Sequence, residues 1–166
     1  MITETEAYGG VSDRASHSYG GRRTQRNEPM YHEGGIAYVY LCYGIHHLFN
    51  VVTGPKGTPT AVLIRSLAPL DGVEVMLRRR RKKEVHPSLT AGPGSLSQAL
   101  GITTRFSGIQ LSAPPIWIED RGIGIPSVQI AAGPRIGVAY AGEDAQLPWR
   151  FFIHGHPYVS RPNRLK

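Results

Sequence analysis

Residues 36–53 read IAYVYLCYGIHHLFNVVT, two apolar stretches that are separated by Tyr43 and Gly44. Both stretches are rich in the β-branched and aromatic residues that favour strands, and a glycine-containing dipeptide between such stretches is a turn signal. We therefore predict a β-hairpin with a large aromatic side chain at its tip. Residues 60–69, TAVLIRSLAP, extend the pattern as a third strand, nearly all apolar except for Arg65.

Shorter elements are expected on both sides of this hairpin. Residues 2–8 alternate between two faces and are predicted to form a strand. Residues 9–35 are rich in glycine and form a predicted loop, longer than compact domains usually carry and more often functional than decorative. Helices are expected over 70–83 and 92–101, and short strands over the last third of the chain. These elements predict a β-rich α+β fold in one domain, residues 1–166.

The composition is that of a basic globular protein. The chain has 166 residues with 19 Lys and Arg against 12 Asp and Glu, a net charge of +7. No apolar run approaches the roughly 18 residues that a membrane helix needs, and the N-terminus does not resemble a signal peptide. The single cysteine, Cys42, excludes a disulfide framework and a zinc site built on cysteine pairs. The positive charge favours a polyanionic partner, although many enzymes of small anionic substrates are also basic.

Charged and aromatic residues are unevenly distributed along the chain. Five acids lie within residues 1–33, none lies within 34–70, and six of the eight tyrosines precede residue 44. The run RRRRKK, Arg78 to Lys83, is most often a solvated helix end, where cations are favourable. It also fits a patch that contacts phosphates. The first quarter of the chain therefore holds the acid chemistry and most of the aromatic surface.

Arg65 is a candidate functional residue, because its guanidinium lies in an apolar strand and a buried charge needs a partner. With no acid near it in sequence, the best partners are Glu4 and Glu6, on the strand that carries carboxylates. On these residues alone, a structural ion pair is the commoner explanation. Tyr8 shares a face with Glu6 and adds an aromatic wall, which favours a pocket.

Exposed aromatic and imidazole side chains give weaker signals. Tyr43 either folds back on the surface or acts as a wedge between stacked bases. His17 is a lone loop histidine, a kind of residue that is usually just solvated. The pairs at 46–47 and 154–156 lack the neighbouring cysteine or carboxylate spacing of a metal site, so we predict neither a metal nor a cofactor. The glycine-led segment 92–96 lacks the lysine of a nucleotide P-loop, although its amides could bind one phosphate.

Several blocks of sequence run in order over nearly the whole chain. They are ETEAY (4–8), His17-Ser18, Arg26-Asn27, YVYLCYGIHHLFNVV (38–52), LIRSLAPLDG (63–72), GPGSLSQALGI (92–102), PRIGVAYAGE (134–143) and PWRF (148–151). Each block is weak alone, but in combination they resemble the methylpurine DNA glycosylases, the 3-methyladenine or alkyladenine class of base-excision enzymes. The resemblance implies a curved antiparallel sheet with a few helices. It also implies an enzyme that extrudes a damaged nucleotide from duplex DNA and hydrolyses its N-glycosidic bond.

The resemblance implies roles for individual residues. Glu6 matches the catalytic general base that activates water, and Arg65 matches the arginine that helps to orient that carboxylate and the flipped nucleotide. Tyr8, His17 and Tyr40 match the residues that sandwich and hydrogen-bond the flipped base.

Three further residues match positions that contact the base and the stack. Asn50 matches the asparagine that discriminates against the exocyclic amino group of guanine. Tyr43 matches the residue that fills the gap left in the stack, with Ile45 next to it. Alkylated purines carry positive charge, so an aromatic pocket would attract them by roughly 0.5–2 kcal/mol of cation–π energy. A neutral purine such as hypoxanthine would depend more on hydrogen bonds, from groups such as His17.

No lysine lies near the pocket motifs to form a Schiff base. We therefore expect a monofunctional DNA-3-methyladenine glycosylase for alkylated or deaminated purines, of the 3-methyladenine, 7-methylguanine and hypoxanthine class. The expected partner is double-stranded DNA that contains damaged purines. The protein is expected to be a monomer, cytoplasmic and, in a bacterium, associated with the nucleoid, with no membrane partner.

The chain departs from the family pattern at several points. Ser95 replaces a usual lysine, Gln25 a proline, and Asp144 occupies a position that is often tryptophan. The chain begins five residues before Glu6, so the N-terminal part of the family fold is expected to be missing. The main alternative is a non-catalytic DNA-binding relative, inactive through truncation. An RNA-binding or ribosomal protein would explain the basic run but not ETEAY.

Overall fold

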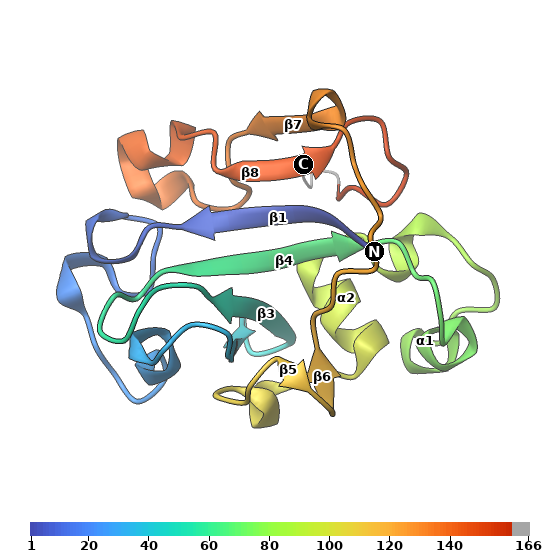
Figure 1. Ribbon diagram of the computed structural model, residues 1–166, viewed down its shortest axis with the longest axis horizontal. Coiled ribbons are helices and arrows are strands. Elements are labelled where there is room, and N and C mark those ends of the chain that lie inside the picture. Colours follow the sequence, from blue (N-terminus) through green and yellow to red (C-terminus); the bar gives the residue numbers. More distant parts are fainter. Residues whose placement is uncertain (161–166) are drawn as a thin grey trace.

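The computed structural model describes residues 1–160, and its centre is a six-stranded antiparallel sheet (Figure 1). The strands are β1 (Ile2–Tyr8), β2 (Ala37–Cys42), β3 (His46–Val52), β4 (Ala61–Leu67), β7 (Ile130–Gly133) and β8 (Arg150–Ile153). Their order is β2-β3-β4-β1-β8-β7. Because β1 lies between β4 and β8, segments from both ends of the chain meet in the middle of the sheet. The predicted hairpin, the third strand and the N-terminal strand are confirmed.

Two α-helices complete the α+β architecture of residues 1–160, and both were predicted. They are α1 (Val73–Arg80) and α2 (Pro93–Leu100). Helix α1 is shorter than predicted, because Arg81 adopts a left-handed conformation at φ 51° and ends it within the basic run. Helix α2 has Pro93 in its first turn, where a fixed φ suits the helix, and ends at Gly101 with φ 73°.

Short elements link these strands and helices. The 3-10 helices are η1 (Gly10–Ser12), η2 (Tyr19–Gly21), η3 (Glu28–Tyr31), η4 (Pro87–Leu89), η5 (Thr104–Phe106), η6 (Ser127–Gln129) and η7 (Ala139–Gln146). A small hairpin pairs β5 (Ser112–Ala113) with β6 (Ile116–Trp117). In Figure 1 this hairpin lies beside the large sheet, and the chain that follows it runs past the N-terminus towards β7.

The two faces of the sheet are covered differently. On one face, Val39, Phe49 and Ile64 form the main core with Leu96 of α2 and with Ile102 and Leu111. On the other face, the predicted loop over 9–35 packs against the strands. Its buried Met30 and Tyr31 form a cluster with Ile36, Tyr38, Val52 and Ala61. The long loop is therefore a packed cover for this face of β2, β3 and β4.

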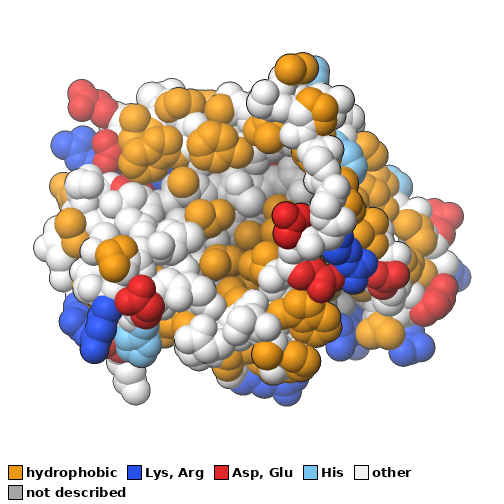
Figure 2. Space-filling model, viewed as in Figure 1, with side chains coloured by type: hydrophobic (Ala, Val, Ile, Leu, Met, Phe, Trp, Pro, Cys, Tyr) orange, Lys and Arg blue, Asp and Glu red, His pale blue; other side chains and the backbone are white. Residues whose placement is uncertain are grey.

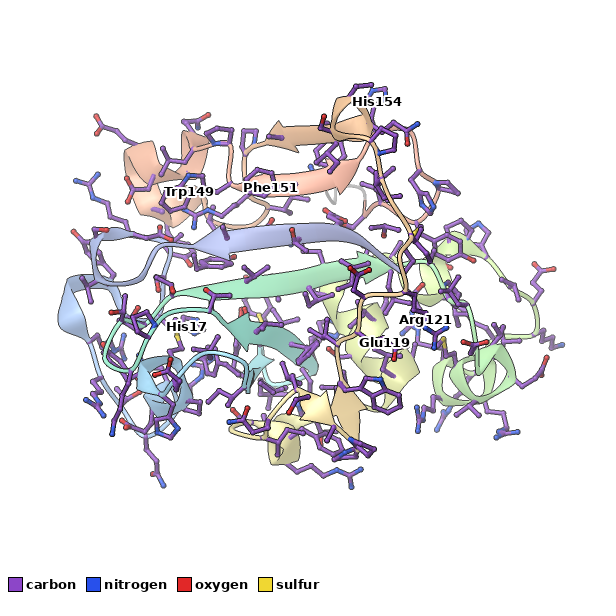
Figure 3. All side chains as sticks on the ribbon, viewed as in Figure 1. His17, Glu119, Arg121, Trp149, Phe151 and His154 are labelled. Atoms are coloured by element: carbon purple, nitrogen blue, oxygen red, sulfur yellow. The ribbon has the colours of Figure 1, made fainter. Side chains whose placement is uncertain are left out.

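A large hollow opens on the face that carries α2. It has a volume of about 530 Å³ and a mainly apolar lining that includes Phe49, Leu96 and Trp117 (Figure 2). At its rim, Arg121 lies 3.0 Å from Asp71 and also pairs with Glu119 (Figure 3). Side chains alternate along a strand, so Asn50, the neighbour of Phe49, faces the opposite side of the sheet.

Within residues 1–160, no helix is long and apolar enough to cross a lipid bilayer.

Candidate functional site

Two adjoining cavities lie on the loop-covered face of the sheet. The first, which we call the inner slot, has a volume of about 40 Å³ and is lined by Tyr8, Ala15, Ser16, His17, Met30, Tyr38, Tyr40, Asn50, Ala61 and Tyr140. The second, which we call the basic vestibule, has a volume of about 380 Å³ and shares Ser16, His17, Tyr38 and Tyr140 with the slot. Its lining adds Arg14, Arg22 and Arg26. A narrow aromatic slot thus opens into a wider, positively charged space.

The walls of the inner slot are aromatic and in mutual contact. The rings of His17 and Tyr40 meet edge to face with centroids 4.5 Å apart, and those of Tyr38 and Tyr40 are 5.5 Å apart. The Asn50 amide nitrogen donates to the backbone carbonyls of Tyr38 and Leu48 at 3.1 and 3.4 Å. Four predicted base-binding residues, Tyr8, His17, Tyr40 and Asn50, therefore line one cavity.

Glu6 lies directly behind Tyr8 and is fully buried. Its Oε1 accepts a hydrogen bond of 2.7 Å from the Ile136 amide, and its Oε2 accepts one of 3.0 Å from the Tyr8 hydroxyl. Burial, followed by the charge of Glu6, raises the pKa of Tyr8 well above its usual value, so this hydroxyl stays protonated and remains a donor. Glu6 is thus oriented on both oxygens and reaches the slot through Tyr8.

Arg65 pairs with both carboxylates that the sequence suggested. Its Nε lies 3.0 Å from Glu4 Oε1 and its Nη1 lies 3.3 Å from Glu6 Oε1, and its side chain is 7% exposed. The prediction that Glu4 or Glu6 would be its partner is confirmed, and the arginine bridges the two. The contact of Arg65 with Glu4 lies within the packed sheet, whereas its contact with Glu6 adjoins the candidate site.

Tyr43 and Ile45 lie apart from the slot, at the tip of the β2–β3 hairpin. Tyr43 is 89% exposed and Ile45 is 71% exposed. Tyr43 has a φ of 50° and Gly44 one of 72°, so the turn holds the tyrosine outward in a conformation that is uncommon for a side-chain-bearing residue. This exposure contradicts the alternative that Tyr43 folds back on the surface, and its role as a wedge stays a prediction.

Sequence reasoning missed a second buried ion pair beside the slot. Arg135 donates to both carboxylate oxygens of Asp13 at 2.6 and 2.9 Å, and both side chains are fully buried. The guanidinium also lies 4.9 Å from the ring centroid of Tyr8 and 5.0 Å from that of Trp149, which Figure 3 labels. The pair therefore supports Tyr8 from outside the slot. The only sequence signal for this pair was that Arg135 lies in a segment rich in glycine and apolar residues and that few acids were available to pair with it.

The basic run is anchored to α2 rather than wholly solvated. Arg79 donates to the Ala99 carbonyl at 3.2 Å, and Arg80 donates to Ser95 Oγ at 3.1 Å. The serine that stands at the usual lysine position is thus contacted by an arginine from the neighbouring helix. At another departure, Asp144 accepts a hydrogen bond from the Arg14 amide at 2.8 Å.

His17 is held neutral by its surroundings. Burial, followed by the charges of Arg26 and Arg22, lowers its pKa from 6.5 to about 4. Its Nδ1 lies 2.7 Å from the Tyr38 hydroxyl, whose pKa is raised to about 12 by burial. Tyr38 was not predicted as a site residue, yet it fixes the orientation of the imidazole.

This neutral histidine predicts a pH dependence of stability. The unfolded chain protonates His17 near pH 6.5, whereas the folded protein resists protonation down to about pH 4. The unfolded state therefore binds more protons in that window, and the free energy of unfolding falls as the pH is lowered through it. Urea denaturation at pH 7 and pH 5 measures this loss, which should be smaller in His17→Gln. The exposed His154 (Figure 3) provides the control, because His154→Gln should lose as much as the wild type. An equal loss in His17→Gln would contradict the prediction.

Similarity to known proteins extends over nearly the whole chain. Residues 1–157 match the family model described as methylpurine-DNA glycosylase (MPG). A Bacillus cereus (strain G9842) protein is 49% identical over 170 residues, which cover 97% of this chain and 82% of the relative. A Bacillus anthracis (strain CDC 684) protein is 48% identical over the same shares. The names of both relatives assign them provisionally as 3-methyladenine DNA glycosylases.

Proposed function

The chain belongs to the methylpurine-DNA glycosylase family, and from this premise we propose that it flips alkylated or deaminated purines out of duplex DNA and hydrolyses their N-glycosidic bond. The substrates are of the 3-methyladenine, 7-methylguanine and hypoxanthine class. One observation carries the proposal: the Glu6 carboxylate is fully buried and doubly oriented directly behind an aromatic slot.

The slot is suited to a purine that carries positive charge. Tyr8, Tyr40 and His17 offer aromatic surface, and cation–π contact with such rings is worth about 0.5–2 kcal/mol. Because His17 is neutral, it does not repel a cationic base. With the Tyr38 hydroxyl as donor to Nδ1, the ring would carry its hydrogen on Nε2 and donate it to a neutral base such as hypoxanthine.

Asn50 supports discrimination against guanine. Its amide nitrogen is committed to backbone carbonyls, and the side chain is 3% exposed at the wall of the slot. A base with an extra exocyclic amino group would meet a fixed, buried side chain there. The cost of flipping, a few kcal/mol and least for a damaged base, adds selectivity before the slot is reached.

The reaction itself is assigned to Glu6 with Arg65 and Ile136 beside it. A water bound to Oε2 beside the Tyr8 hydroxyl gives its proton to Glu6 and forms a bond with C1′ of the flipped nucleotide. The bond between C1′ and the purine nitrogen breaks, and its electron pair leaves with the base. A cationic methylpurine leaves as a neutral molecule. The Arg65 guanidinium and the Ile136 amide hold the carboxylate in place during the step.

The lining of both cavities favours a hydrolase over a lyase. Among residues 1–160, no lysine lines the inner slot or the basic vestibule, so no amine is available there for a Schiff base. The three vestibule arginines instead suit the negatively charged DNA backbone. The products would be a free purine and an abasic strand.

A panel of lesions tests this proposal. Duplex oligonucleotides with one hypoxanthine, one 3-methyladenine or no lesion are incubated with the protein, and the released base is quantified by liquid chromatography. We expect release from the damaged duplexes alone. Salt-dependent binding of duplex DNA without release would favour a non-catalytic relative and contradict the proposal.

Tyr43→Ser is expected to weaken capture of the lesion without affecting the fold. The side chain is 89% exposed, so it contributes little to stability, but without it nothing fills the gap in the base stack. Fluorescence of a lesion-containing duplex reports capture, and thermal unfolding reports the fold. Val128→Ser is the matched control, since Val128 is equally exposed but lies in η6. Equal effects of both substitutions, or unfolding of Tyr43→Ser, would contradict the wedge.

A further inference from the structure

Glu4, the second carboxylate of β1, is buried in the sheet and takes no part in the reaction proposed above. It accepts five hydrogen bonds: from Arg65 Nε at 3.0 Å, Arg150 Nε at 2.6 Å, Ser66 Oγ at 2.9 Å, Ser160 N at 2.6 Å and Ser160 Oγ at 2.8 Å. Burial would raise the pKa of Glu4, but the hydrogen bonds from Arg150 and Ser160 and the charge of Arg65 outweigh it and lower the pKa. Glu4 is therefore an anion at neutral pH.

The sheet is irregular where it meets this carboxylate. Glu4 pairs with Ser66 and Thr5 with Ile64, so Arg65 is an extra residue between two pairs. In a regular strand the side chains of Arg65 and Ser66 would point to opposite faces. Here both reach Glu4, as expected where a bulge re-aims a side chain. The local backbone is thus shaped around the Glu4 carboxylate.

Glu4 also determines where two guanidiniums lie relative to Glu6. Arg65 is held through Nε by Glu4 and through Nη2 by Ser160 Oγ at 3.2 Å, which leaves Nη1 next to Glu6. Arg150 is the cross-strand partner of Glu6, yet its Nε bonds to Glu4. Glu4 therefore compensates two positive charges that would otherwise act on Glu6 alone.

We propose that Glu4 is a positioning residue for the reaction: it fixes Arg65 and offsets the positive charge beside Glu6, the carboxylate that takes a proton from water. The role of Glu4 in catalysis rests on the proposed function. The effect of Glu4 on the charge around Glu6 is a property of the folded protein and is measurable without substrate.

The charges around Glu6 determine whether a substitution beside it stabilises or destabilises its ionised form. Glu6 contacts Tyr8 from β1 and Arg65 from β4, and it interacts electrostatically with Arg135 from the segment after β7. Glu4 lies on the other side of Arg65, Arg150 of β8 is the cross-strand partner of Glu6, and Asp13, after η1, pairs with Arg135. Glu4 and Glu6 balance Arg65 and Arg150, and Asp13 balances Arg135. Removing Glu4 leaves an excess positive charge that stabilises ionised Glu6, whereas removing Arg150 leaves an excess negative charge with the opposite effect.

Carbon-13 NMR titration of the Glu6 carboxyl tests these expected effects. The Glu6 signal is assigned as the one that is missing from the spectrum of Glu6→Gln. Glu4→Gln should move the midpoint to lower pH, and Arg150→Gln should move it to higher pH. The double variant should return towards the wild type. Arg121→Gln, which removes a cation paired with acids at the rim of the far cavity, should leave the midpoint unchanged.

Shifts in opposite directions cannot arise from a common loss of structure. Shifts of both single variants in the same direction, or no shift in either, would overturn the proposal. If Glu4→Gln does not fold, Arg150→Gln decides alone, and an unmoved midpoint there overturns it. Base release measured against pH should show its acid limb displaced in the same two directions. Wild-type protein that releases no base would defeat the proposed function, whereas the NMR titration would still decide the role of Glu4.

Discussion

Glu6→Gln is expected to slow the release of damaged purine by about 10²–10⁴-fold, the usual contribution of a general base. Glutamine has nearly the same volume, and its carbonyl oxygen still accepts the Ile136 amide. It cannot take a proton from water, and it removes the negative charge that Arg65 faces at 3.3 Å. The loss should therefore fall on the chemical step and leave DNA binding nearly unchanged.

Single-turnover rates on a lesion-containing duplex measure this loss, with circular dichroism and DNA binding measured in parallel. Glu119→Gln is the matched control, because Glu119 lies at the rim of the cavity on the other face and should have no effect (Figure 3). A folded Glu6→Gln protein that releases base at the wild-type rate would exclude Glu6 as the base.

Asp13→Asn is expected to lower the free energy of unfolding by about 3–5 kcal/mol, since it leaves Arg135 buried without a counter-charge. The Asp13 carboxylate accepts two bonds from Arg135 and also the amides of Gly9 at 3.0 Å and Ala15 at 2.9 Å. Burial would raise the pKa of Asp13, but these hydrogen bonds outweigh it and lower the pKa. Asparagine retains only one of the two acceptor oxygens.

Urea denaturation measures this effect as a lower midpoint at an unchanged slope. Arg23→Gln, which breaks the exposed pair with Glu28 at 2.6 Å, should barely move the midpoint because exposed pairs contribute little. Equal small shifts in the two variants would show that the Asp13–Arg135 pair is not a structural support. Because Arg135 lies over the Tyr8 ring, we also expect Asp13→Asn to loosen the wall of the slot.

The elements that sequence predicted correctly are those encoded locally. The β2–β3 hairpin follows from two β-rich stretches around a glycine turn, and α2 from its proline start and glycine end. The pairing of Arg65 was predictable because a buried charge needs a partner and few acids were available. Its bridging of two carboxylates was not, because it depends on an irregularity in the pairing of β1 with β4.

Other contacts between distant segments escaped sequence reasoning. Asp13 and Arg135 are far apart in the chain, and each looks like an ordinary surface residue until the fold buries both. The orientation of Glu6 by the Ile136 amide has no side-chain signal at all, since any residue there supplies an N–H. Tyr38 looked like one aromatic among several, and only its contact with His17 gives it a role.

The most direct test of the central claim is a single-turnover reaction on a duplex with one 3-methyladenine or hypoxanthine, with the released base and the strand analysed together. We predict a free purine and an unbroken strand with an alkali-labile abasic site, formed at a rate that depends on Glu6, and no adduct trapped by borohydride. An intact lesion after prolonged incubation, or a cleaved strand with a trapped adduct, would contradict hydrolysis by a Glu6-activated water.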